Sequence, residues 1–153
     1  MSKTIILGLL VGFPLLALAA GGGGDSSDSS SFSEPDTYSK AKSLVEDGEF
    51  EAAIPVLFDA IREDDQNADA YNLLGFTHRK TGRIEVALKY YRKALALNPR
   101  HRGAHEYLGE AFLELGDLDS AKKHLAFLDK DCTFGCREYA MLKKAIERYR
   151  SRK

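Results

Sequence analysis

Residues 68–101 read ADAYNLLGFTHRKTGRIEVALKYYRKALALNPRH, and this stretch decides the fold of the chain. Apolar and small side chains recur at helical spacing on both sides of Gly82, which marks the break between two amphipathic segments. The first set is Tyr71, Leu73, Leu74 and Gly75, and the second set is Ala87, Leu88, Tyr91, Ala94 and Leu95. Pro99 then ends the second segment, because proline does not continue a helix. The stretch therefore predicts two short helices joined as a hairpin.

The hairpin pattern recurs every 34 residues. The residues that lie 34 positions after Leu74, Gly75, Gly82 and Ala87 are Leu108, Gly109, Gly116 and Ala121, and those 34 positions before are Lys40, Ala41, Gly48 and Ala53. Such a hairpin cannot bury its own apolar face, so neighbouring units must stack on it. We therefore divide the chain into three units, residues 34–67, 68–101 and 102–135.

The spacing within the middle unit also carries a family resemblance. Tyr71, Leu74, Gly75 and His78, followed by Ala87, Tyr91, Ala94 and Pro99, resemble the tetratricopeptide repeat pattern W-x2-L-G-x2-Y, A-x3-F, P. The resemblance implies an all-α fold, a right-handed superhelical solenoid of three helix-turn-helix repeats. The ending LxxxCxxGCxEYxxLxxAI, residues 128–146, is similar to that of some exported bacterial members of the family.

Residues 136–153 are expected to form a capping helix after the third unit. Tyr139, Leu142, Ile146 and Tyr149 fall on one helical stripe, which predicts packing against the third unit. The rest of the segment is strongly basic, with seven lysines and arginines against two acids after Cys136. A basic tail that binds anionic lipid or nucleic acid is the alternative. The formal net charge of -1 for the whole chain excludes a globally basic nucleic-acid binder, and we expect no nucleic-acid partner.

The first 19 residues are typical of a secretory signal peptide. Lys3 precedes an apolar run that starts at Ile5, and Ala17 and Ala19 form a small-x-small cleavage pattern. The run spans about 15 residues, fewer than the roughly 20 that a membrane-spanning helix needs. We expect cleavage after Ala19 and export to the periplasm or beyond. An uncleaved membrane anchor is the alternative.

Residues 20–33, AGGGGDSSDSSSFS, predict a flexible tether between the signal peptide and the repeats. Glycine, serine and aspartate supply too little apolar surface for a packed core. The segment contains no Asn-x-Ser/Thr acceptor for glycosylation. The repeats are thus expected to follow a linker that has no role of its own.

Cys132 and Cys136 are the only clustered reactive side chains in the sequence. In an exported protein the expected state of such a pair is a disulfide, which would hold the start of the capping helix. Two soft thiolates at this spacing are also able to share a copper ion or act in redox chemistry. A thiol- or copper-handling accessory protein is therefore the alternative function.

No motif in the sequence predicts an enzyme. His101 and His105 have a spacing that binds metal on one helical face, but His105 occupies the position of Tyr71 in the preceding unit and is expected to be a packed ring. A Ser-His-Asp set, a phosphate-binding loop and a nucleotide motif are all missing from the sequence. We expect a non-enzymatic protein that needs no cofactor and no metal.

The resemblance places a partner-binding groove on the first helices of the repeats. The candidate residues lie off the packing stripe of these helices: Tyr38, Lys42, Asn72, Phe76, Arg79, Glu106 and Glu110. Phe76 is the candidate anchor for an apolar side chain of the partner, unless the neighbouring unit covers it. Glu106 and Glu110 replace the basic pair with which chaperone-binding members grip a C-terminal carboxylate. We therefore expect a protein or peptide partner whose basic residues meet these two acids at a solvated rim.

Overall fold

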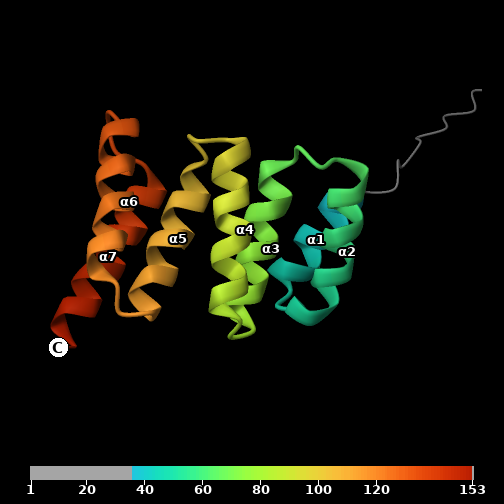
Figure 1. Ribbon diagram of the computed structural model, residues 1–153, viewed down its shortest axis with the longest axis horizontal. Helices are drawn as coiled ribbons and strands as arrows, with labels where there is room; N and C mark the ends of the chain where they lie inside the picture. The colour runs from blue at the N-terminus through green and yellow to red at the C-terminus, as the bar shows by residue number, and fades with distance from the viewer. Residues whose placement is uncertain (1–35, 153) are drawn as a thin grey trace, which may run out of the picture. The chain divides into compact units, whose positions relative to one another are not determined.

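The computed structural model describes residues 36–152, and this part of the chain folds into seven α-helices without a strand. In order they are α1 (Thr37–Glu46), α2 (Phe50–Glu63), α3 (Ala68–Lys80), α4 (Ile84–Leu97), α5 (Arg102–Glu114), α6 (Leu118–Asp131) and α7 (Arg137–Ser151). Consecutive helices form hairpins that stack side by side, as Figure 1 shows. The all-α solenoid of helix-turn-helix repeats that the sequence predicts is confirmed. The predicted signal peptide, residues 1–19, and the predicted linker, residues 20–33, lie outside the described residues.

The three hairpin turns share one backbone geometry. Gly48, Gly82 and Gly116 have φ angles of 82°, 78° and 82°, a left-handed conformation that side chains with a Cβ rarely adopt. The residue after each glycine donates its backbone N–H to a carbonyl near the end of the preceding helix, at 2.8 Å in all three turns. Each glycine therefore ends the first helix of a hairpin in a standard C-terminal turn. The helices that follow leave these turns in equivalent directions.

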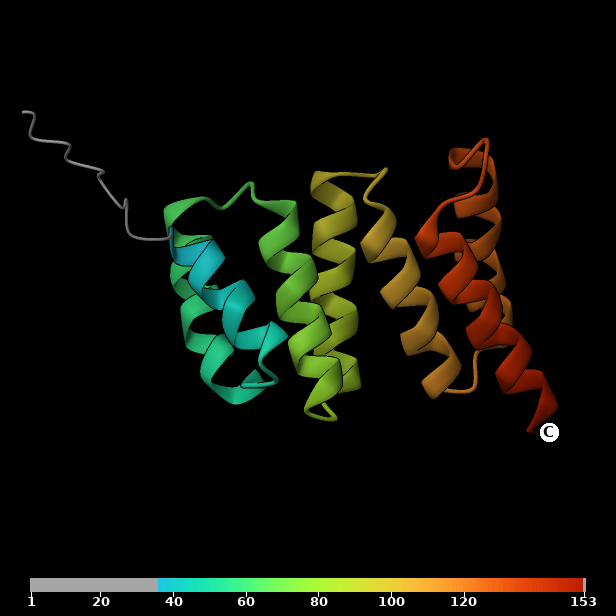
Figure 2. The same ribbon diagram turned by 180° about the vertical axis from the view of Figure 1, so that it is seen from behind.

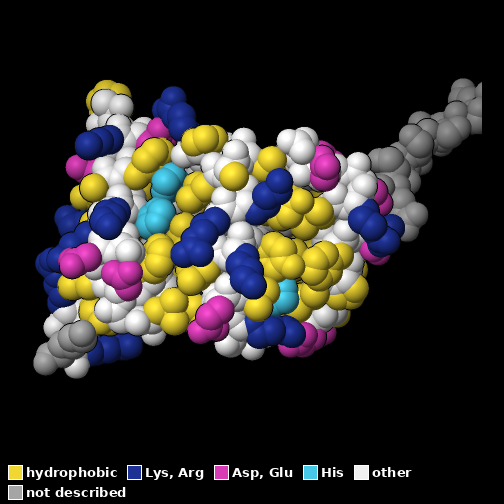
Figure 3. Space-filling view, in the orientation of Figure 1, with side chains coloured by type: hydrophobic (Ala, Val, Ile, Leu, Met, Phe, Trp, Pro, Cys, Tyr) yellow, Lys and Arg dark blue, Asp and Glu magenta, His cyan; other side chains and the backbone are white. Residues whose placement is uncertain are grey.

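The helices form two layers, which define two faces of the described unit. The first helices α1, α3 and α5, continued by α7, make the inner face, and they lie nearer the viewer in Figure 2. The second helices α2, α4 and α6 make the outer face, which Figure 3 shows with lysine, arginine and hydrophobic side chains at the surface. Within the described residues, no helix has the length and apolar character needed to cross a membrane.

Close approaches between helices fix how the layers pack. A Cβ on Gly75 would lie 2.7 Å from the Tyr91 ring, so α3 approaches α4 so closely at this point that only glycine fits without a shift of the ring. A Cβ on Gly109 would lie 2.6 Å from a methyl carbon of Leu142, which brings α7 equally close to α5. Leu142 is fully buried and Ile146 is 3% exposed. Helix α7 therefore continues the inner layer and covers the apolar end of the third repeat, as the capping prediction requires.

Candidate functional site

Two cavities lie on the inner face, and together they form the candidate site. The groove pocket has a volume of about 440 Å³ and is lined by Lys42, Val45, Glu46, Leu73, Phe76, Tyr107 and Arg137. The cap pocket has a volume of about 380 Å³ and is lined by Arg79, Glu110, Leu113, Glu114, Ala145, Arg148, Tyr149 and Arg152. Helices α3, α5 and α7 contribute to both pockets, whereas α1 contributes only to the groove pocket.

Aromatic rings form the floor of the groove pocket. The Phe76 ring packs at 5.0 Å from the Tyr107 ring and edge-on at 6.2 Å from the Phe50 ring, measured between centroids. Phe76 is therefore partly covered by its neighbours, as one of the two sequence interpretations proposed, but it still lines an open cavity. The geometry leaves one side of an aromatic surface free for an apolar ligand group.

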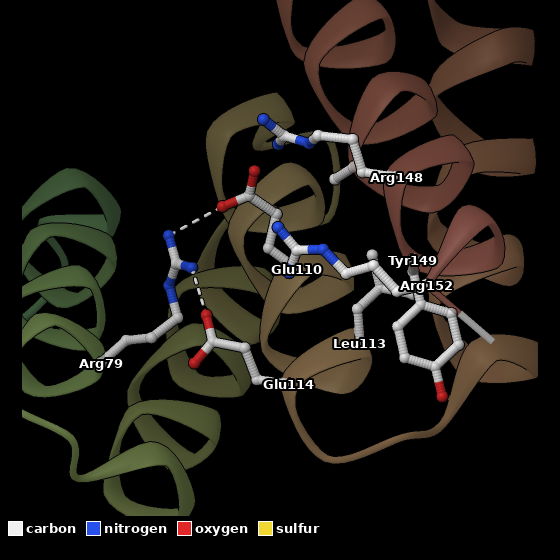
Figure 4. Close-up of a pocket in the computed structure, with 8 residues that line it drawn as sticks. Arg79, Glu110, Leu113, Glu114, Arg148, Tyr149 and Arg152 are labelled. Atoms are coloured by element: carbon white, nitrogen blue, oxygen red, sulfur yellow. Dashed lines mark hydrogen bonds and ion pairs between the residues drawn. The ribbon is translucent and has the colours of Figure 1, made fainter.

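An arginine bridge separates the groove pocket from the cap pocket. Arg79 donates to Glu110 at 2.8 Å and to Glu114 at 2.6 Å, as the dashed lines in Figure 4 show, and its side chain is only 10% exposed. The guanidinium carbon also lies 5.7 Å from the ring centroids of Phe76 and Tyr107, a distance at which a cation and a π-system attract. Burial acts to lower the pKa of Arg79, but the Tyr91 hydroxyl and the two carboxylates raise it overall. Arg79 therefore stays charged and joins α3 to α5.

Glu106 differs from its predicted environment. The sequence places its carboxyl at a solvated rim, whereas the residue is only 7% exposed in the structure. Burial, assisted by the nearby Glu110 and Glu138, raises the pKa of Glu106 to about 7. Glu110 likewise does not lie free, because it binds Arg79. The expectation of two solvated carboxylates is therefore wrong, because Glu106 is buried and Glu110 is paired with Arg79.

The structure brings the predicted groove residues together only in part. Lys42 and Phe76 meet in the groove pocket, and Arg79 and Glu110 meet in the cap pocket. Tyr38, Asn72 and Glu106 line neither pocket. Burial is the largest cause that raises the pKa of Tyr38 to about 12, and the amide oxygen of Asn72 is buried without a hydrogen-bond partner.

Sequence reasoning missed the contribution of α7 to the site. Arg137 lines the groove pocket, and Arg148 and Arg152 line the cap pocket. The capping helix is therefore also a wall of the candidate site. The signal for this role was available, because Arg148 and Arg152 are four residues apart and so share one face of a helix that continues the inner layer.

The cysteine pair lies at the joint between α6 and α7. The two sulfurs are at disulfide distance and the Cα atoms are 5.6 Å apart. Cys132 directly follows the last residue of α6, and Cys136 directly precedes the first residue of α7. A link at this position ties the third repeat to the capping helix. Among the described residues, no cluster of three or more His, Cys, Asp or Glu side chains is arranged to hold a metal ion.

The histidines that the sequence singled out have separate partners. His101 lies 3.0 Å from the carboxylate of Asp69, and its Nδ1 accepts the backbone N–H of Ala104 at the start of α5. His105 is 8% exposed and stacks on the Phe127 ring at 3.7 Å between centroids, which confirms the packed-ring interpretation. Its Nδ1 lies 2.9 Å from Nδ1 of His124. The rings of His105 and His124 therefore take part in the packing of the third unit.

Stacked helical hairpins with a pocketed inner face define the class of helical-repeat solenoids. Within this class, the family model described as tetratricopeptide repeat matches residues 38–83 and 76–122, which together make up more than half of the chain. The chain therefore belongs to the tetratricopeptide repeat family.

Similarity to individual proteins is more distant. The photosystem I assembly protein Ycf3 of Rippkaea orientalis is 33% identical over 95 residues, which cover 56% of this chain and 55% of Ycf3. The chain therefore spans about half the length of this curated relative.

Solved structures share the fold at lower identity. The type III secretion chaperone SycD of Yersinia enterocolitica, in complex with a peptide of the translocator YopD, superposes with a TM-score of 0.66 at 18% identity, over 76% of this chain and 91% of SycD. PcrH, in complex with the chaperone binding region of PopD, gives a TM-score of 0.65 at 20% identity, over 76% of this chain and 90% of PcrH. The first repeat domain of Spaghetti (RPAP3), bound to an HSP90 peptide, gives a TM-score of 0.65 at 20% identity, over 73% and 89%. At these identities the likeness shows the fold alone.

Proposed function

We propose that this protein is a non-enzymatic interaction module that binds a segment of a partner protein on its inner face. The observation that carries the proposal is the groove pocket, in which Phe76 and Tyr107 leave an aromatic surface open beside the cations of Lys42 and Arg137. Burial of one apolar side chain of the partner in this pocket would contribute about 1.5 to 3 kcal/mol to the free energy of binding. An extended or helical segment is the ligand that such a groove fits.

The likeness to other proteins supports the same role. SycD and PcrH are solved with peptides or binding regions of translocators, and the Spaghetti domain is solved with an HSP90 peptide. Ycf3 is an assembly protein by name. We propose that the present chain acts in an envelope, periplasmic or secretion assembly, as an exported bacterial member of the family. The signal-peptide pattern of residues 1–19 is what supports this location.

A comparison between the two faces tests the proposal. Peptides that bind the native protein are selected from a displayed library of random 12-residue sequences, and their affinities are measured for Phe76→Ala and for Phe58→Ala. Phe58 is the matched control because it is a 42% exposed ring on α2, in the outer layer. We expect Phe76→Ala to weaken binding about tenfold or more and Phe58→Ala to leave it unchanged. Loss of binding only in Phe58→Ala would place the partner on the outer face and refute the proposal.

Phe76 also packs against its neighbours, so folding has to be checked. Arg137 is exposed at the edge of the same pocket, and Arg137→Glu changes its charge without opening a cavity in the core. Lys89 on α4 is exposed, which makes Lys89→Glu its control of equal charge change. Thermal melts followed by circular dichroism establish that each variant folds before its binding is compared.

The cysteine pair remains the basis of the alternative function, a thiol- or copper-handling accessory protein. In the structure both sulfurs are at disulfide distance, and this arrangement supports a structural link between α6 and α7. Free-thiol and bound-metal measurements on protein purified from the periplasm separate the two functions. Stoichiometric copper together with reduced thiols would favour the alternative.

A further inference from the structure

The cap pocket contains two cations for which the described part of the chain supplies no acidic partner. Arg148 on α7 and Arg152, which directly follows the helix, are exposed and extend toward the pocket from the side opposite Arg79 (Figure 4). Within the described residues 36–152, no ion pair joins either arginine to a carboxylate. Their charge is therefore available to a ligand.

The acids that line the same pocket are already engaged. Glu110 and Glu114 both accept from Arg79, the only other cation in the lining. Counted over the lining residues, three arginines face two carboxylates, which leaves a net charge of one positive unit. The buried side chains of Leu113 and Ala145 form an apolar part of the lining, and an apolar neighbourhood strengthens a charge interaction. The cap pocket is thus suited to a single negative charge.

Arg79 joins the cap pocket to the groove pocket. Arg79 lines the cap pocket, and its guanidinium lies over the rings of Phe76 and Tyr107 that line the groove pocket. Arg79 lies three positions after Phe76, about 4.5 Å along the helix axis. An extended partner segment advances about 3.3 Å per residue and a helical one about 1.5 Å, so groups in the two pockets would be roughly one to three residues apart in one segment.

We propose that the cap pocket binds an aspartate or glutamate side chain of the same partner segment whose apolar residue occupies the groove pocket. The proposal rests on the proposed function and adds the charge of the partner to it. A carboxylate matches two guanidinium groups in geometry as well as in charge, because each arginine presents parallel N–H donors. A phosphate group carries nearly two negative charges, whereas the lining has a net charge of one positive unit, so phosphate matches the pocket less well.

The proposal reverses the charge that the sequence suggested for the partner. Glu106 and Glu110 were expected to receive basic residues, but the first is buried and the second is neutralised by Arg79. The free charge on the inner face comes instead from α7, with Arg137 beside the groove pocket and Arg148 and Arg152 in the cap pocket. The capping helix would therefore select the partner as well as close the solenoid.

A library selection with charge-swapped variants tests the proposal. The displayed library of random 12-residue peptides is selected on the native protein and on Arg148→Glu/Arg152→Glu, with Arg150→Glu as control. Arg150 is exposed on α7 and lies on the opposite side of the helix from Arg148. We expect native protein to enrich Asp or Glu one to three residues from an apolar residue, and the double variant to enrich Lys or Arg at that position. Arg150→Glu should select as the native protein does.

Synthetic peptides then give the affinities. A selected peptide should lose about tenfold in affinity when its acid is replaced by the amide, and Arg148→Gln/Arg152→Gln should show no such loss, because the charge-assisted hydrogen bonds are already gone. The association rate of the native pair should fall as salt is raised, since exposed charges are screened. A C-terminally amidated peptide should bind unchanged, because a side chain and not the chain terminus carries the charge.

The outcomes separate this proposal from the proposed function. Peptides that depend on Phe76 but show no acidic preference, or that lose binding on amidation of the terminus, would overturn the assignment of the cap pocket and leave the groove intact. Enrichment of Lys or Arg by the native protein would also overturn it. Selection of no peptide, or of peptides insensitive to Phe76→Ala, would refute the groove and this proposal together.

Discussion

The contact between Gly109 and Leu142 predicts that Gly109→Ala destabilises the native protein but stabilises the Leu142→Ala variant. A Cβ on residue 109 would lie 2.6 and 2.8 Å from the two methyl carbons of Leu142. Leu142 is fully buried in a cluster with Leu113, Leu128 and Ile146, so it has no space into which to move. Gly109→Ala alone therefore overpacks the joint between α5 and α7.

The magnitudes follow from two opposing effects. Overpacking of this kind costs about 1 to 3 kcal/mol, while alanine gains about 1 kcal/mol over glycine in a helix interior. We expect Gly109→Ala to lower the free energy of unfolding by the difference of the two effects, up to about 2 kcal/mol. Leu142→Ala alone should lower it by about 2 to 5 kcal/mol, because it opens a cavity in the cap. In the Leu142→Ala background the clash is gone, and Gly109→Ala should raise stability by about 1 kcal/mol.

Urea unfolding followed by circular dichroism at 222 nm measures all four proteins of this cycle, since the chain has no tryptophan to report by fluorescence. The expected coupling energy equals the overpacking cost, about 1 to 3 kcal/mol. Gly75→Ala serves as control, because its Cβ would meet the Tyr91 ring at 2.7 Å and would gain nothing from the loss of Leu142. Equal effects of Gly109→Ala in the two backgrounds would refute the contact as the reason for the glycine.

Four further predictions concern titration, the cap and the N-terminus. The pKa of Glu106 in the folded protein, about 7, is above its ordinary value of 4.5, so the free energy of unfolding should fall as pH rises from 4.5 to 7. Glu106→Gln should remove this fall, and urea unfolding at pH 8 should find the variant about 1 to 3 kcal/mol more stable than the native protein. Burial, and next His105, lowers the pKa of His124 from 6.5 to about 4, so the free energy of unfolding should decline as pH falls from 6.5 to 4. The decline should be smaller in His124→Gln, whose amide keeps a donor for His105. Removal of residues 137–153 exposes Leu142's partners, and a truncated protein that still melts cooperatively at an unchanged temperature would contradict the capping role of α7. Intact-mass measurement of exported protein should find a chain that begins near Ala20, and a mass that retains residues 1–19 would indicate an anchor.

The fold was predictable because its determinants recur in the sequence. Gly82 and its counterparts 34 residues away adopt the turn that the pattern requires, and Leu74 and Leu108 are buried as the packing stripe predicts. Each repeat supports the interpretation of the next. Leu142 likewise continues the same stripe into the cap, where it is fully buried.

The candidate site was predictable only in part, because its geometry depends on angles between helices. Phe76 lies off the stripe and does line a pocket, but its coverage by Phe50 and Tyr107 depends on how neighbouring helices pack. Glu106 is off the stripe as well, yet it is buried. Period and spacing say which residues share a helical face, and they do not say how neighbouring faces meet.

The pairing of Arg79 shows a second reason for the miss. Its partners Glu110 and Glu114 are 31 and 35 positions away, so no local spacing links them to Arg79. The sequence does not indicate this bridge, and Glu110 was therefore expected to bind a basic ligand. Once the bridge is known, the charge left over on the inner face belongs to α7. The proposed charge of the partner thus depends on one long-range ion pair.

The identical turns at Gly48, Gly82 and Gly116 make the length of this molecule adjustable in discrete steps. A duplicate of residues 68–101 inserted after His101 would contain the same glycine turn, and on its C-terminal side it would meet the third unit through the surface that the native middle repeat presents. Such a lengthened protein would carry a second copy of Phe76 on an inner face one hairpin longer, with the same helix α7 at its end. A gene encoding this chain is therefore able to gain reach toward longer partners by internal duplication, without any change in how the ends are closed.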